Sequence, residues 1–371
     1  MPRKSTTEKI RYAVVGLGHI AQDAVLPAFK NTKNCELTAL ISGDPKKLKV
    51  LGKKYKVKNL FSYDQFDECM QSGLIDAVYI ATPNINHREF TERAARQGVH
   101  VLTEKPMAIG EQDGLAMVRA AKREDIKLMV AYRLHFDPAN LRAIEIAQNG
   151  KLGDLRIFNS VFTFQVTDKE NIRLQYDMGG GPLYDIGIYC LNASRYLFRD
   201  EPIEAFAMAA STEDERFSEV EEMMAVTLRY PKSRLATFVI SFGAAANSTY
   251  DLLGTEGTLR LENCYDYVEE MHLTTTINDK KAKRTFKKHD QFAPELEYFA
   301  ECILKDQQPE PSAEEGLLDI KIIEAIYDSV RTRRPVRIDS FKKMTRPSLR
   351  QEIRKPAHRK PETVHVRGPH D

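Results

Sequence analysis

The first 133 residues alternate short apolar runs with segments of helical length, and this alternation most restricts what the chain can fold into. The apolar runs lie at 11–16, 36–42, 75–82, 100–105 and 127–133, and the helix-length segments lie at 20–30, 85–97 and 111–123. Runs that are apolar throughout are typical of strands buried on both faces. Strand and helix alternating at this spacing predict a parallel sheet with helices on both sides.

The first apolar run leads directly into a glycine-containing loop, VVGLGHIA, at residues 14–21. Gly16 would permit the tight turn after a strand, Gly18 would let a pyrophosphate approach bare backbone, and Ala21 would let the following helix pack closely. The positive end of that helix would face the phosphates. The pattern therefore predicts an α/β Rossmann domain over residues 9–133 that binds a dinucleotide. The predicted contacts in this loop are Gly16, Leu17, Gly18, His19 and Ile20.

The end of the second run bears on which dinucleotide is bound. An acidic residue there would bind the ribose hydroxyls and repel a 2′-phosphate. The chain has Ser42 and Gly43 at this point, with Lys47 in the next helix, and a hydroxyl and an ammonium suit a phosphate. We therefore favour NADP, with NAD possible. Asp44 could cap the next helix or still bind a ribose hydroxyl.

The segment ATPNINH follows the third of these runs. Loops at the carboxyl ends of parallel strands line the ligand crevice, which makes this segment a candidate for cofactor contact. An equally good interpretation is local, with Asn84 as a helix N-cap and His87 three residues further on. The candidate contacts here are Thr82, Pro83, Asn84 and His87.

From residue 134 the pattern changes to period two. Segments 155–166, 223–230 and 234–242 alternate apolar and polar residues, and 252–263 is predicted to form a hairpin that turns at Glu256 and Gly257. Two helices are predicted near 292–303 and 317–330. We predict an α+β domain over 134–340 with an open, predominantly antiparallel sheet. A bare apolar face on that sheet would favour a homodimer or homotetramer.

Composition restricts the remaining choices. The 371-residue chain has a formal net charge of +2, and five cysteines occur singly. These features predict reduced, buried thiols in a cytoplasmic protein, with no metal site, no membrane and no nucleic acid as a partner. We expect no signal peptide and no membrane helix. Residues 341–371 are basic and rich in proline, and we expect a solvated, disordered tail.

The segment GGGPLYDIGIY (179–189) places an aspartate and a tyrosine on one face of a predicted helix. We expect the three glycines to let the backbone pass close beneath a ligand. Lys105 precedes a proline at the end of a strand and is expected to point toward this helix. A tyrosine is a poor base until a cation stabilises its phenolate, which Lys105 could do. Asp185 could bind a sugar hydroxyl or hold Lys105, and Tyr189 would be the base. Taken separately, these residues could equally be a buried tyrosine and a helix-start aspartate.

Together, Gly16-Leu17-Gly18, EKP at 104–106, YRLHFDP at 132–138 and GGGPLYDIGIY resemble the Gfo/Idh/MocA oxidoreductases, from about residue 9 to 339. GGGPLYDIGIYCLNASRYLF is similar to the glucose–fructose oxidoreductase branch. The resemblance implies hydride transfer between a nicotinamide and a sugar or polyol at the domain interface. It implies Lys105, Asp185 and Tyr189 as catalytic residues. The predicted substrate contacts are Lys105, Arg133, Asp185 and Tyr189, and the remaining predicted cofactor contacts are Glu104, Lys105 and Arg133.

Tyrosine at 189, where many relatives carry histidine, favours an aldopyranose such as glucose or xylose, oxidised at the anomeric hydroxyl to a lactone or formed in the reverse reduction. His135 is a secondary substrate candidate together with Arg133, and Arg173, Tyr176 and Asn192 are weaker again. The glucose–fructose enzymes have an arm ahead of the Rossmann domain, and this chain has about nine residues there, which predicts a freely exchanging cofactor. The alternatives are a transhydrogenase with retained NADP, a non-catalytic dinucleotide sensor, and a nucleic-acid-binding tail.

Overall fold

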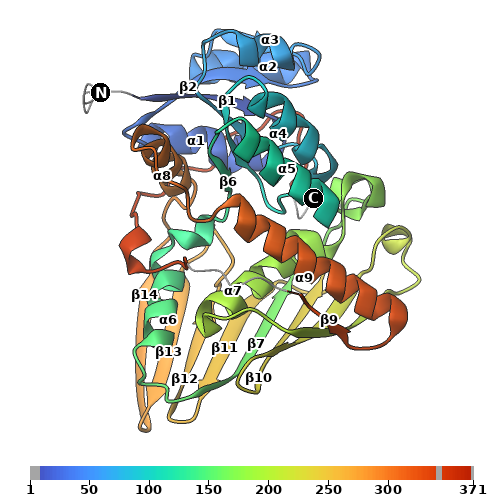
Figure 1. Cartoon of the computed structure of the whole chain (residues 1–371), viewed down its shortest axis with the longest axis vertical. Coiled ribbons are helices and arrows are strands. Elements are labelled where there is room, and N and C mark those ends of the chain that lie inside the picture. The colour runs from blue at the N-terminus through green and yellow to red at the C-terminus, as the bar shows by residue number, and fades with distance from the viewer. Residues whose placement is uncertain (1–8, 340–344, 369–371) are drawn as a thin grey trace.

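A computed structural model describes residues 9–339 and 345–368 (Figure 1). In this part of the chain the first sheet has six parallel strands in the order β3-β2-β1-β4-β5-β6. They are β1 (Ile10–Val15), β2 (Cys35–Ile41), β3 (Asn59–Phe61), β4 (Ala77–Ile80), β5 (His100–Thr103) and β6 (Leu128–Val130). The chain order reverses between β1 and β4, and a ligand crevice in such a sheet lies outside the carboxyl ends of those strands.

The predicted parallel sheet is confirmed, with one addition. Strand β3 was not predicted from the sequence because it has only three residues, all at least partly exposed, and forms the edge of the sheet beside β2. The helices that connect the strands are α2 (Pro45–Tyr55), α3 (Phe66–Gln71), α4 (His87–Ala95) and α5 (Glu111–Arg123). After β1 the connection is a π-helical turn (Ala21–Val25) that continues into α1 (Leu26–Ala28).

The second sheet is mostly antiparallel, as predicted. Its order in the described chain is β14-β13-β12-β11-β7-β10-β9-β8-β15, and β10 pairs with β7 in parallel. The strands are β7 (Leu155–Thr163), β8 (Glu204–Ala210), β9 (Met223–Tyr230), β10 (Arg234–Ser241), β11 (Asn247–Gly254), β12 (Gly257–Glu262), β13 (Met271–Ile277), β14 (Lys280–Phe286) and β15 (Val336–Arg337). The predicted hairpin is β11–β12, in which β12 begins at Gly257.

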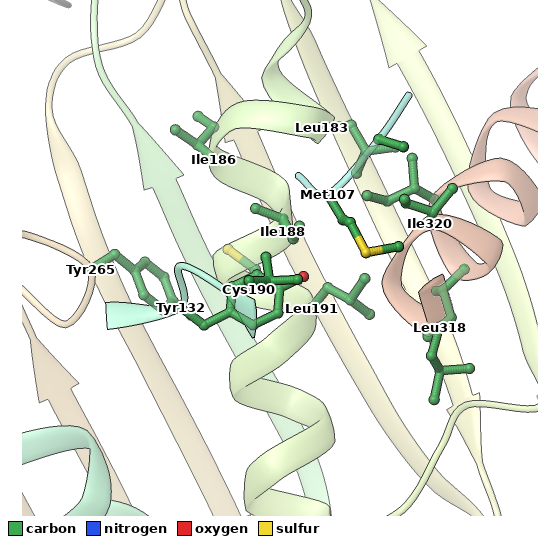
Figure 2. Packing of buried hydrophobic residues seen from close by; sticks show 14 of the residues in the cluster. Met107, Tyr132, Leu183, Ile186, Ile188, Cys190, Leu191, Tyr265, Leu318 and Ile320 are labelled. Atoms are coloured by element: carbon green, nitrogen blue, oxygen red, sulfur yellow. The ribbon is translucent and has the colours of Figure 1, made fainter. Parts of the chain in front are cut away.

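One face of this sheet is covered by α6 (Pro138–Gln148), α7 (Ile188–Phe198) and α9 (Ala313–Thr332) (Figure 1). Figure 2 shows Ile188 and Leu191 of α7 beside Met107, from the segment after β5, and Leu318 of α9. All of these side chains are buried. Helix α7 therefore lies where the second sheet, α9 and the first domain meet. That position places the residues just before α7 at the domain interface.

Helix α8 (Ala293–Leu304) lies against the first sheet although it comes late in the chain (Figure 1). Leu296 and Phe299 belong to the same buried cluster as Tyr12 and Leu26, and the Tyr12 hydroxyl donates to the Leu296 carbonyl at 3.0 Å. The sequence-based boundaries of 9–133, 134–340 and 341–371 remain predictions. Helix α8 lies in the second of these ranges, yet it packs in the core of the first domain.

Residues 345–368 run back along the molecule, which differs from the solvated tail expected from their composition. The Asp290 amide donates to the Lys355 carbonyl, and His358 Nε2 donates to the Asp23 carbonyl at 2.9 Å. The basic residues also find acidic partners, as Lys355 does with Glu297. Pairing of this kind gives a polar segment specific contacts that net composition does not reveal. Residues 341–344 and 369–371 of the predicted tail lie outside the described residues.

Candidate active site

The loop after β1 has the geometry that a dinucleotide needs. Gly16 has φ +89°, and a Cβ built on it would lie 2.5 Å from the Ala81 carbonyl oxygen, so a side chain is excluded. At Gly18, no atom of the described residues lies within 4 Å of a built Cβ, which leaves open space beside the backbone. The helical turns begin directly after this loop. The loop therefore fits a diphosphate approaching a helix N-terminus.

The end of β2 presents a mixture of hydroxyl, carboxylate and ammonium groups. Asp44 is the N-cap of α2, where it accepts from the amides of Lys46 (2.8 Å) and Lys47 (3.1 Å). The Ser42 side chain is buried, and its hydroxyl accepts from the Asp44 amide. Burial lowers the pKa of Lys47, which lies at the edge of this site. The capping role weighed for Asp44 is therefore the one the structure shows.

The segment after β4 is held by bonds to other segments. Asn84 Nδ2 donates to the Gly179 carbonyl at 2.8 Å, and α4 has Asn86 at its N-cap, so the capping role considered for Asn84 is wrong. His87 is fully buried, with its ring nitrogens 2.9 Å from the Pro106 carbonyl and 3.1 Å from the Thr82 carbonyl. Burial lowers the pKa of His87, which favours the neutral ring. The neutral ring can donate to one of these two carbonyls, so His87 lies behind the site and joins α4 to one of its segments.

The side-chain hydroxyl of Thr82 differs from the polar groups beside it because it makes no hydrogen bond within the described residues. Among the described residues, the buried Thr82 Oγ1 has no hydrogen-bond partner. A buried hydroxyl is expected to be paired, either within the protein or with a ligand. This atom lies just beyond the carboxyl end of β4, at the crevice, and fits a contact to a bound nucleotide.

Lys105 and Asp185 meet across the two domains, as predicted. Lys105 Nζ donates to Asp185 Oδ1 at 2.7 Å and to the Asp185 carbonyl at 2.8 Å, while Arg173 Nε donates to Oδ2 at 2.7 Å. Burial opposes both charges. The pKa of Asp185 nevertheless lies well below its usual range because of Arg173 and Lys105, and the pKa of Lys105 is raised by Asp185 and other neighbours. The pair is therefore an ion pair at neutral pH.

Tyr189 is half-buried between two cations. Arg133 Nε donates to the Tyr189 hydroxyl oxygen at 3.2 Å, and Lys105 Nζ lies 5.1 Å from the ring centroid. Arg133 is itself fixed, since its other nitrogens donate to Gln291 Oε1 and, at 2.6 Å, to the Tyr265 carbonyl. The predicted group of Lys105, Arg133, Asp185 and Tyr189 is thus a single cluster. Arg133 therefore holds the hydroxyl end of Tyr189, and Lys105 lies over its ring.

Beside this cluster lie the carboxyl groups of Glu104 and Glu295, of which only Glu104 was predicted from the sequence. The Tyr79 hydroxyl donates to Glu104 Oε1 at 2.7 Å, and Glu295 Oε1 lies 3.2 Å from the same hydroxyl. Burial raises the pKa of Glu104, and burial with Glu104 nearby raises the pKa of Glu295 well above its usual value. The surroundings of Glu295 therefore favour its protonated form. Sequence reasoning missed Tyr79, Glu295, Gln291 and Tyr265 because none lies in a recognisable pattern.

The glycine run that precedes α7 packs against protein in the described structure. A Cβ on Gly179 would lie 2.5 Å from Ile109, and one on Gly180 would lie 2.6 Å from the Arg173 carbonyl oxygen. Gly179 therefore packs against the first domain and Gly180 against the turn that precedes it, while the passage beneath a ligand stays a prediction. A π-helical turn (Leu183–Gly187) follows, and it carries the Asp185 carbonyl that Lys105 contacts. Such turns are frequent at functional sites.

The weaker candidates are spread more widely. Tyr176 is 72% exposed, whereas Asn192 is buried and donates to Asp319 at 2.7 Å. His135 lies in the wall of a cavity of about 30 Å³, and among the described residues its ring nitrogens have no hydrogen-bond partner. The cavity also has Lys105 and Tyr189 in its wall. His135 and Asn192 therefore lie beside the cluster, and Tyr176 does not contribute to this cavity.

The geometry defines a class of protein, namely two-domain oxidoreductases with a nucleotide loop on one side and a Lys-Asp-Tyr cluster at the domain interface. The model for the oxidoreductase family with an NAD-binding Rossmann fold matches residues 10–132, and the model for the Gfo/Idh/MocA C-terminal domain matches residues 140–260. The chain therefore belongs to the Gfo/Idh/MocA family, and the predicted resemblance is confirmed.

Several similar proteins are named for activity on sugars. The chain is 33% identical over 341 residues to an NADP-dependent D-xylose 1-dehydrogenase of Haloarcula marismortui, covering 90% of this chain and 95% of the relative. It is 36% identical to the crystal structure of an aldose–aldose oxidoreductase from Caulobacter crescentus complexed with glycerol, with a TM-score of 0.85 over 89% of this chain and 100% of that one. A 3-ketoreductase from Actinomadura kijaniata, crystallised with NADP, shares 25% identity with a TM-score of 0.79, over 87% of this chain and 98% of that one.

Proposed function

We propose that the chain is an NADP-dependent sugar dehydrogenase that oxidises an aldopyranose, such as glucose or xylose, at its anomeric hydroxyl to a lactone, or catalyses the reverse reduction. The observation that carries this proposal is the cluster of Lys105, Arg133 and Tyr189, which gathers two cations around one phenol at the domain interface. The named activities of the relatives support a sugar as substrate and NADP as cofactor.

In this mechanism the bound nicotinamide supplies a hydride acceptor. Tyr189 Oη takes the proton of the anomeric hydroxyl, and Lys105 and Arg133 stabilise the negative charge on that oxygen before the proton arrives. Because both Asp185 carboxylate oxygens already accept from charged donors, we assign Asp185 to positioning Lys105. Of the two roles weighed for Asp185, binding a sugar hydroxyl is the less favoured.

The preference for NADP rests on the end of β2. The Asp44 carboxylate, which could repel a 2′-phosphate, is occupied by the α2 cap and by His365, whose Nδ1 lies 3.0 Å from Oδ2. Ser42 and Lys47 remain as a hydroxyl and a cation for the phosphate. A hydrogen bond to a charged group contributes about 1.5–3 kcal/mol, so one such contact gives a preference of roughly tenfold or more.

The first test is a panel assay of reduced-nicotinamide absorbance with NADP or NAD against aldopyranoses, ketoses and polyols. We expect turnover with at least one aldopyranose, with kcat/KM about tenfold higher for NADP than for NAD. Lactone formation should be confirmed by trapping the product as hydroxamate. Absence of turnover with every sugar, in a preparation that binds NADP, would contradict the dehydrogenase and leave the sensor as the better interpretation.

The open face of the second sheet supports self-association. Adjacent strands place Val161, Val239, Ala225 and Met208 in one row across β7, β10, β9 and β8. Val239 is 44% exposed and Met208 68% exposed, and large exposed apolar surfaces mark interaction sites. A second copy of this chain would cover the row. We therefore propose a homodimer or homotetramer through this face.

Val239→Glu should convert the oligomer to a monomer because it places a charge in the middle of the apolar row. The measurement is molar mass by light scattering during size-exclusion chromatography. Lys281→Glu, at an exposed position of β14, is the matched control and should leave the mass unchanged. A wild-type chain that is monomeric at micromolar concentration would contradict the proposed assembly.

The cysteines, the lengths of the helices and the acidic clusters bear on the remaining expectations. All five cysteines are buried and unpaired, in agreement with the predicted reduced thiols, and they support a cytoplasmic location. Across residues 9–339 and 345–368, no helix combines the length and the apolar character that crossing a membrane requires. In the same residues, no group of three His, Cys, Asp or Glu side chains could hold a metal ion.

A further inference from the structure

Residues 358–368, which we name the C-terminal strap, contact the nucleotide loop of the first domain. The Val364 amide donates to Gln22 Oε1 at 2.8 Å, and Gln22 Nε2 donates to the Val364 carbonyl at 3.0 Å. Gln22 Nε2 also donates to the carbonyl of Leu17, within the glycine loop. Gln22 is 1% exposed, so this junction is sealed from solvent. The strap is therefore joined through one side chain to the backbone that would cradle a diphosphate.

The same strap contacts the end of β2, where the 2′-phosphate ribose is expected. His365 Nδ1 donates to Asp44 Oδ2 at 3.0 Å, and Lys46 Nζ donates to His365 Nε2 at 2.8 Å. Lys54 Nζ, at the far end of α2, donates to the Glu362 carbonyl at 2.7 Å. His365 thus lies between the carboxylate and an ammonium group of the α2 N-terminal turn.

A few residues further on, the strap reaches the second domain. Arg367 Nη1 pairs with Asp168 Oδ2 at 2.5 Å, and Asn171 Nδ2 donates to the Gly368 carbonyl at 3.2 Å. Asn171 caps the short turn that carries Arg173, the partner of Asp185. Between His365 and Gly368 the chain therefore passes from the nucleotide domain to the substrate domain, where it meets the cap of the turn that carries Arg173.

The strap leaves two groups of the predicted nucleotide site without contact. A Cβ built on Gly18 would meet no atom of the described residues within 4 Å beyond its own chain neighbours, and Thr82 Oγ1 has no hydrogen-bond partner among the described residues. Both positions therefore stay available to a ligand while the strap is in place.

We propose that the C-terminal strap closes over the bound nucleotide and slows its release, acting as a clamp between the two domains. This inference rests on the proposed NADP binding, and it reverses the free exchange expected from the short N-terminal segment. Release of the nucleotide requires His365 and Arg367 to leave their partners on opposite sides of the crevice. The C-terminal residues of this chain therefore retain the nucleotide.

The test measures nucleotide release directly. NADPH bound to the protein is displaced with excess NADP in a stopped-flow instrument, and the loss of NADPH fluorescence gives koff. A chain truncated after Glu362, and the full-length double variant His365→Ala/Arg367→Ala, should each release NADPH about tenfold faster or more, since such changes act mainly on koff. Arg359→Ala, at an exposed strap residue, is the matched control and should leave koff unchanged.

The outcomes distinguish retention of the nucleotide by the strap from competition with the nucleotide and from failure to bind it. Unchanged koff in both variants would overturn the clamp. Tighter NADPH binding after truncation would also overturn it, and would show that the strap competes with the nucleotide. Failure of the full-length and truncated chains alike to bind NADPH would overturn the proposed function itself, and retention with it. The double variant keeps the full chain, so a folding defect of the truncated chain does not decide the result.

Discussion

Tyr189→Phe is expected to lower kcat for sugar oxidation by about 10²–10⁴-fold, the range over which a positioned acid–base group contributes. The substitution removes the hydroxyl oxygen to which Arg133 Nε donates at 3.2 Å. It keeps the ring that packs against Lys105 and Arg133. Substrate binding should change much less than turnover. The measurement is steady-state kinetics with the sugar that gives turnover in the panel assay.

Two controls make the result specific to proton transfer. Tyr176→Phe removes a hydroxyl from an exposed tyrosine just before the glycine run 179–181 and should leave kcat unchanged. NADPH affinity of Tyr189→Phe should match that of the wild type, because Tyr189 is assigned to the substrate side of the site. A Tyr189→Phe enzyme with near-normal kcat would assign the proton transfer to another group.

Arg195→Met is expected to lower the free energy of unfolding by about 3–5 kcal/mol, the cost of leaving buried charges without their partner. Arg195 is fully buried and donates to Glu201, Glu315 and Asp319, of which the last two are also fully buried. Methionine fills part of the volume but neutralises none of these carboxylates. Urea unfolding followed by circular dichroism would measure the loss.

The pH dependence of this loss tests its electrostatic origin. Burial raises the pKa of Asp319 to about 6, although Arg195 opposes that rise. Because the folded state binds this proton more tightly than the unfolded state, ionisation of Asp319 costs stability as pH rises from about 4 to about 6 in the wild type. Removal of Arg195 takes away the charge that opposes the rise, so in Arg195→Met the pKa of Asp319 lies higher and the cost keeps growing above pH 6. The loss in Arg195→Met should therefore be larger at pH 7 than at pH 5. Arg216→Met, which breaks an exposed pair with Asp214, should cost much less than Arg195→Met and should show little dependence on pH between 5 and 7.

The sequence predicted those parts of the molecule whose physical cause is local. The parallel sheet follows from apolar runs, and the meeting of Lys105 with Asp185 follows from strand ends that face the domain interface. Strand β3 escaped prediction because three partly exposed residues carry no periodic signal. Gln291 and Tyr265 fix Arg133 from far along the chain, and no spacing in the sequence relates them to it.

The C-terminal strap shows why composition alone misleads. A basic, proline-rich segment usually lacks enough apolar surface to fold. In this strap His365 and Arg367 each meet an acidic side chain on a body that is already folded, and Lys355, just ahead of it, does the same, so pairing contributes much of the order. Such pairing depends on surface positions that only the folded structure brings together.

The placement of α8 has a consequence for synthesis of the chain on the ribosome. Residues 10–130 leave the exit tunnel well before 293–304, and at bacterial or eukaryotic elongation rates the interval is on the order of ten seconds. During that interval the surface that later receives Leu296 and Phe299 remains uncovered. We therefore expect the nascent N-terminal half to expose apolar surface until α8 is made, so completion of its core waits for a helix encoded near the end of the message.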